Sequence, residues 1–87
     1  MSFIQELADE LAKDVLESQE ELGSDTFYEQ VGRVLLTASP TLQEAYMTSI
    51  RIRLAERRGR DFLMKALKAK REGAKAPDAP RDVGVGH

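Results

Sequence analysis

The chain has 87 residues, no cysteine, one histidine and a formal net charge of −2. Its length allows one small domain at most, and the lack of cysteine excludes disulfides, thiolate chemistry and zinc sites built on sulfur. The net charge hides a split, because residues 1–50 carry ten acids and two bases, whereas residues 51–87 carry eleven bases and five acids.

The N-terminus has no basic region followed by a continuous apolar run, so it does not read as a signal peptide. No stretch approaches the roughly 20 apolar residues that a membrane-spanning helix needs. We therefore expect a cytoplasmic protein.

Residues 2–22 have the pattern of an amphipathic helix. Ser2 and Gln5 have the spacing of a capping box, and Gly23 is typical of the residue that ends a helix. Apolar residues recur in steps of three and four, and acidic residues occupy the opposite face. The predicted apolar face consists of Phe3, Ile4, Leu7, Ala8, Leu11, Ala12, Val15, Leu16 and Leu22.

Residues 25–38 predict a second, shorter helix. Thr26 and Glu29 have capping-box spacing, and one face would hold Phe27, Val31, Val34, Leu35 and Ala38. The residue before Pro40 is pushed out of helical geometry, while proline itself suits the first turn of a helix, so a turn is expected there. Such short connections favour antiparallel neighbours.

Residues 40–72 predict a long third helix that carries nine of the thirteen Lys and Arg residues. Its apolar residues change faces halfway along: the first half presents Leu42, Tyr46, Ile50 and Leu54, and the second half presents Phe62, Leu63, Ala66 and Leu67 on roughly the opposite side. Either the helix bends near Gly59 or the second face packs against another chain. The expected fold is all-α, a three-helix domain over residues 1–72.

The basic residues of this helix form rows. One row consists of Arg53, Arg57, Arg60, Lys68 and Arg71, and a second consists of Arg51, Arg58 and Lys65. Rows of this kind can follow the phosphates of a nucleic acid. They also occur on ordinary solvated faces, because Arg and Lys favour helices and suit their last turn, so both interpretations stay open.

Residues 73–87 are rich in glycine and proline and predict a flexible, disordered tail. The only histidine, His87, ends that tail without a second ligand or a catalytic partner. The carboxylate pairs of the first helix lie on a predicted solvated face, and no glycine-rich phosphate loop is present. We therefore expect no enzyme activity, no metal, no cofactor and no small-molecule substrate.

The pattern favours a helical interaction protein, a self-associating adaptor, regulator or inhibitor, that contacts its partner through Phe62, Leu63 and Leu67. The alternative is a nucleic-acid-binding accessory protein that uses the first basic row. Small phage or mobile-element proteins such as DNA-packaging small subunits share this layout, which is an analogy of size and class only. The acidic first half of the chain and the pI near 5.4 count against nucleic-acid binding. Attachment to a membrane surface is the weakest interpretation, because the first helix would present its acids to anionic lipid.

Overall fold

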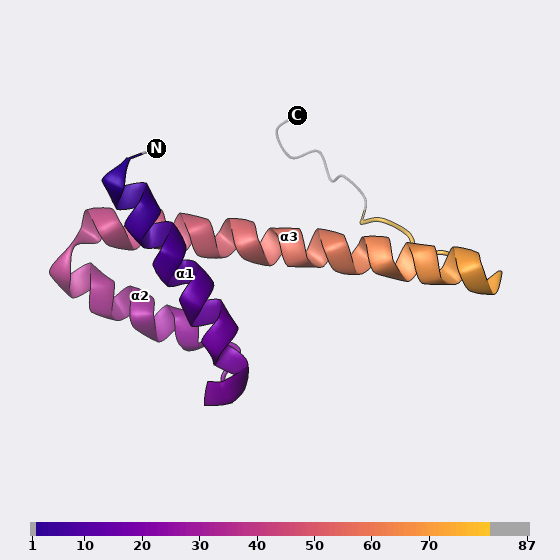
Figure 1. Ribbon diagram of the computed structural model, residues 1–87, viewed down its shortest axis with the longest axis horizontal. Helices are drawn as coiled ribbons and strands as arrows, with labels where there is room; N and C mark the ends of the chain where they lie inside the picture. The colour runs from indigo at the N-terminus through magenta and orange to yellow at the C-terminus, as the bar shows by residue number, and fades with distance from the viewer. Residues whose placement is uncertain (1, 81–87) are drawn as a thin grey trace. The chain divides into compact units, whose positions relative to one another are not determined.

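The computed structural model describes residues 2–80, and over this range the fold consists of helices joined by short connections (Figure 1). The helices are α1 (Phe3–Leu22), α2 (Phe27–Ala38) and α3 (Pro40–Glu72), and residues 2–80 contain no strand. The predicted all-α fold with three helices is therefore confirmed. Residues 81–87 of the predicted tail, including His87, lie outside the described residues.

The chain divides into two compact units, Met1–Ala55 and Glu56–His87, which we call the first and the second unit. The long helix α3 contributes residues to both units. Gly59 lies inside α3, which continues through it, and its φ is not positive. α3 is one continuous helix from Pro40 to Glu72, and the bend that the sequence allowed at Gly59 is not shown.

The ends of α1 follow the predicted capping chemistry. Ser2 Oγ accepts a hydrogen bond from the backbone N–H of Gln5 at 3.1 Å, and Gln5 Oε1 accepts one from the N–H of Ser2 at 3.5 Å. At the other end, Gly23 adopts the left-handed conformation with φ of 69°. Ser24 N–H then donates to the carbonyl of Gln19 at 3.1 Å, which satisfies one of the carbonyls left free by the last turn.

The predicted capping box of α2 is wrong. Thr26 makes no side-chain hydrogen bond to the first turn of α2. The buried side chain of Gln19 takes this role instead: its Oε1 accepts from the N–H of Tyr28 at 2.8 Å, and its Nε2 donates to the carbonyl of Asp25 at 3.3 Å. One amide of α1 therefore satisfies an N–H that has no partner within α2.

The connection between α2 and α3 is a single residue, as the sequence predicts. Ser39 is extended, with φ of −158° and ψ of 99°, and Pro40 begins α3. Ser39 Oγ accepts a hydrogen bond from the N–H of Leu42 at 3.2 Å. The serine therefore caps α3, which explains why the helix starts at the proline.

The core of the first unit is small. Figure 1 shows α1 lying across α2 and the first half of α3. Six buried apolar side chains form the core: Ala8, Ala12, Val15, Leu16, Tyr46 and Ile50. The two alanines let the backbone of α1 approach α3, whose Tyr46 and Ile50 are the largest fully buried side chains. The predicted apolar face of α1 is buried only along its middle, because Phe3, Ile4 and Leu7 at its start and Leu22 at its end are exposed.

A polar contact and a glycine join α2 to α3. The hydroxyl of Tyr46 donates a hydrogen bond to the backbone carbonyl of Tyr28 at 2.9 Å. A Cβ placed on Gly32 would lie 3.2 Å from Sδ of Met47, so the missing side chain allows the two helices to approach closely. Within α2, the predicted apolar face is only partly buried, because Val34 and Ala38 are exposed.

The second unit contains the rest of α3 and the chain that follows it. Gly73 has φ of 71°, and Ala74 N–H donates to the carbonyl of Ala69 at 2.8 Å, which ends α3 as Gly23 ends α1. The chain then turns back beside the last turns of the helix (Figure 1), and Ala69 is buried. Residues 74–80 are exposed and have no helix or strand. The flexibility of the tail stays a prediction.

Candidate functional site

Three neighbouring apolar side chains on the second unit are exposed to solvent. Leu63 is 49% exposed, Met64 is 53% exposed and Leu67 is 37% exposed. Leu63 and Leu67 are four residues apart and Met64 and Leu67 are three apart, so they are neighbours on the helix surface. We call these three residues the distal patch. Clustered exposed apolar side chains of this kind usually mark a binding surface.

The structure separates Phe62 from the other two residues of the predicted partner-binding set. Phe62 and Ala66 are half-buried and Ala69 is buried, at spacings of four and three residues that place them on one stripe. This stripe lies on a different side of α3 from Leu63 and Leu67, since adjacent helical positions differ by about 100°. Phe62 therefore belongs to the covered side of the second unit. Met64, which the sequence reasoning omitted, completes the exposed cluster.

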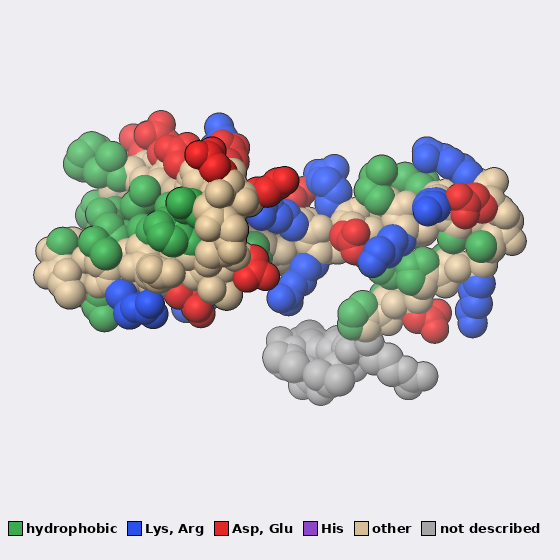
Figure 2. All heavy atoms as spheres, turned by 90° about the horizontal axis from the view of Figure 1, so that it is seen from below, with side chains coloured by type: hydrophobic (Ala, Val, Ile, Leu, Met, Phe, Trp, Pro, Cys, Tyr) green, Lys and Arg blue, Asp and Glu red, His purple; other side chains and the backbone are tan. Residues whose placement is uncertain are grey.

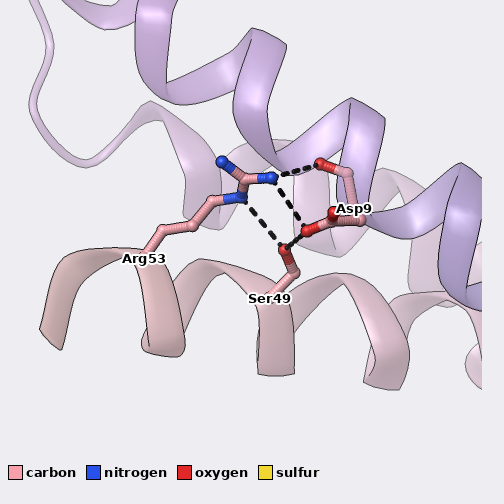
Figure 3. Close-up of polar contacts among 3 residues, drawn as sticks. All are labelled: Asp9, Ser49 and Arg53. Atoms are coloured by element: carbon pink, nitrogen blue, oxygen red, sulfur yellow. Dashed lines mark hydrogen bonds and ion pairs between the residues drawn. The ribbon is translucent and has the colours of Figure 1, made fainter. Parts of the chain in front are cut away.

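Arg53, the first residue of the predicted basic row, forms an ion pair and hydrogen bonds within the first unit (Figure 3). Its Nη2 donates to Oδ1 of Asp9 at 2.9 Å and to the Asp9 carbonyl at 3.4 Å. Its Nε donates to Oγ of Ser49 at 3.2 Å, and the Ser49 hydroxyl in turn donates to Oδ1 of Asp9 at 2.7 Å. The hydrogen bonds from Ser49 and Arg53 lower the pKa of Asp9 below its ordinary value of 3.8.

The other members of the basic row lie on the second unit. Arg60 is paired with Glu56 one turn earlier, at 2.6 Å, and Lys65 of the second row is paired with Asp61 at 2.9 Å. Within residues 56–80, the bases that are exposed and make no ion pair are Arg57, Arg58, Lys68, Lys70, Arg71 and Lys75. Of the five members of the row, Arg57, Lys68 and Arg71 thus make no ion pair with any residue that the structure describes.

The two units differ in the charge that they present. Figure 2 shows acidic side chains gathered over α1 and Lys and Arg side chains spread over the second unit. Glu6, Glu10, Asp14 and Glu17 are all exposed on α1. None of these four forms an ion pair within the described range of the chain. The surfaces therefore carry opposite, largely unneutralised charge.

A second exposed apolar cluster, at the start of α1, escaped the sequence reasoning. Phe3 is 72% exposed, Ile4 is 41% exposed and Leu7 is 42% exposed. Phe3 and Leu7 are four residues apart and Ile4 and Leu7 three apart, so they adjoin on the helix. We call these residues the N-terminal patch. Periodicity placed them on the same face as the core residue Ala8, and nothing in the sequence indicated that the core would begin only there.

Residues 2–80 hold no group of three or more His, Asp or Glu side chains that could bind a metal ion. Within the same range, no helix combines the length and apolar character needed to cross a bilayer. The two apolar patches and the free charges beside them are thus the features from which a function can be argued.

Comparison with protein-family models, with curated proteins and with solved structures finds no match to this chain.

Proposed function

We propose that this chain is a small, non-enzymatic helical interaction protein that self-associates through the distal patch and the bases beside it, serving as an adaptor, regulator or inhibitor. The observation that carries the proposal is the exposure of Leu63, Met64 and Leu67 as neighbours on one helix. Covering these side chains would remove apolar surface from water at a gain of about 25 cal/mol per Å².

The modest core of the first unit supports this proposal. Its cluster of buried residues holds only six side chains, two of which are alanines. Domains of this size gain no more than about 3–5 kcal/mol from their own core, and association is a common source of further stability. A second chain that covers the distal patch would supply this further stability.

The test is the replacement of Leu63 and Leu67 by serine, followed by size-exclusion chromatography with light scattering. The proposal predicts that wild type has a mass above the 9.7 kDa of one chain, and that the double variant returns to the single-chain mass. The control is Ile52→Ser, which removes an apolar side chain that is more exposed than Leu63 or Leu67, at 63%, from the part of α3 in the first unit. The control should still associate. An assembly that persists in the double variant contradicts the role of the distal patch.

Nucleic-acid binding is the second candidate, and it rests on the free bases. Arg57, Lys68 and Arg71 are exposed and make no ion pair among residues 2–80. Three phosphate contacts predict that log affinity for duplex DNA falls against log salt with a slope of about −2.7. The assay is a titration of labelled duplex over a salt series with wild type, with Arg57→Glu and Lys68→Glu combined, and with the exposed Arg33→Glu of α2 as control. Binding with that slope, lost only in the double variant, would place this function first.

A further inference from the structure

The N-terminal patch has an acidic border. Glu6 lies three residues after Phe3, and Glu10 lies three residues after Leu7, so each acid adjoins an exposed apolar side chain on α1. Asp14 continues this border one turn further. All three acids are exposed, and none is in an ion pair within the described part of the chain. The patch is therefore an apolar surface bordered by unneutralised negative charge.

The distal patch has the opposite border. Lys68 lies four residues after Met64, and Lys70 and Arg71 lie three and four residues after Leu67. These bases are exposed, and among residues 2–80 none of them is in an ion pair. The two patches are alike in size, with three apolar side chains each, and they differ in the sign of the charge around them.

We propose that the partner of the distal patch is the N-terminal patch of a second copy of this chain. The inference rests on the proposed function, because it requires self-association, and it adds which two surfaces meet. A symmetric contact between two distal patches would bring two basic borders together, which is unfavourable. A contact between a distal patch and an N-terminal patch brings opposite charges together around a shared apolar centre.

This contact is heterologous, so each chain in it keeps one unused patch. A chain whose distal patch is occupied still presents its N-terminal patch, and a further copy can bind there. Heterologous contacts of this kind produce rings if the geometry closes and open chains if it does not. Assembly therefore continues beyond two chains in wild type, and stops at two chains only when one patch of each kind is removed.

The test mixes two variants that lack different patches. The first variant combines Phe3→Ser with Leu7→Ser, and the second combines Leu63→Ser with Leu67→Ser. Each is expected to have the mass of one chain by light scattering, while an equimolar mixture is expected to give a species of twice that mass. Far-UV circular dichroism of each variant, with the exposed Val34→Ser of α2 as a matched control, checks that the helices are retained.

The outcomes separate this inference from the proposed function. If wild type assembles, and the variant without the N-terminal patch assembles equally well, the pairing of the two patches is wrong while self-association stands. If wild type is a single chain at every concentration, self-association fails and the pairing fails with it. Charge reversal gives an independent check that does not alter the apolar residues. The combination of Glu6→Lys with Glu10→Lys should abolish assembly, because both borders are then basic. Mixing that variant with Lys68→Glu combined with Lys70→Glu, whose borders are both acidic, should restore it, and a mixture that stays at the mass of one chain would contradict the pairing of the two patches.

Discussion

Asp9 of α1 and Arg53 of α3 form an ion pair at 2.9 Å, although 44 positions separate them in the chain. Ser49 donates to the same carboxylate oxygen at 2.7 Å, so one acid of α1 is held by two side chains of α3 (Figure 3). The pair fixes α1 against the first half of α3 beside the small core. It also removes Arg53 from the set of bases that are free to bind a partner.

Replacing Asp9 with asparagine should lower the stability of the first unit at neutral pH. The folded-state pKa of Asp9 is lowered, so its contribution is fully present above the ordinary value of 3.8 and is lost as the pH falls through the lower folded value. Urea denaturation of wild type and Asp9→Asn over a pH series tests this: the difference in free energy of unfolding should shrink below about pH 4. Glu17→Gln, an exposed acid without an ion pair among residues 2–80, is the control. If the difference in free energy of unfolding between wild type and Asp9→Asn does not depend on pH, the ionised Asp9 carboxylate is not what stabilises the first unit.

Tyr46→Phe should lower the free energy of unfolding by about 0.5–1.5 kcal/mol, the usual net value of one hydrogen bond. The reason is the loss of the hydroxyl that donates to the carbonyl of Tyr28 at 2.9 Å from a fully buried position. Denaturant titration at neutral pH measures it. An unchanged free energy would mean that this contact contributes nothing to the packing of α2 on α3.

The same tyrosine predicts an alkaline transition. Burial, with a smaller effect from Tyr28, raises the pKa of Tyr46 to about 12. The unfolded chain ionises near pH 10, so stability is intact below that pH and is lost as the pH rises toward the folded value. Wild type should therefore lose more stability than Tyr46→Phe between about pH 10 and 12. Parallel loss in both proteins would show that Tyr46 is not responsible.

Gln19→Leu should destabilise the first unit by about 1–3 kcal/mol, because the side chain is nearly isosteric but leaves the N–H of Tyr28 without its partner. That N–H now donates to Oε1 of Gln19 at 2.8 Å in a buried position. Gln30→Leu, on the exposed side of α2, is the control and should change stability by less than about 0.5 kcal/mol. Thermal unfolding of both variants makes the comparison, and equal effects would contradict the capping role.

Two glycines predict opposite responses to alanine. Gly59 is helical and has open space where a Cβ would lie, so Gly59→Ala should stabilise α3 by about 0.5–1 kcal/mol. Gly23 has φ of 69°, so Gly23→Ala should destabilise by about 1 kcal/mol or more. Far-UV circular dichroism during denaturation measures both. A loss of stability in Gly59→Ala would show that α3 does not run unbroken through this position in solution.

The helices could be predicted because the residues that begin and end them lie within a few positions of each helix end in the sequence. The capping box of Ser2 and Gln5 begins α1, and Gly23 ends it. Ser39 ends α2 and accepts a hydrogen bond from the first turn of α3. Periodicity then supplied the faces of α1 and α3, since residues three and four apart share a side of a helix. These signals need no knowledge of the rest of the fold.

What escaped prediction depends on contacts between distant segments. Periodicity gives the apolar face of α1 but not how far along it the other helices reach. Phe3 lies on that face and is nevertheless exposed. The basic row included Arg53 because spacing alone cannot reveal that Asp9 lies opposite it. Gln19 left a signal that could have been used: a polar amide four residues after Val15, on the buried face of α1, needs partners of its own.

Self-association of the wild-type chain is tested most directly by its mass as a function of concentration. Light scattering or sedimentation over a dilution series should give a mass above 9.7 kDa at the highest concentrations, falling toward that value on dilution. Added salt should shift the transition to higher concentration, since exposed charges border the apolar patches. A mass of 9.7 kDa at every concentration would contradict the proposal that the distal patch joins copies of this chain.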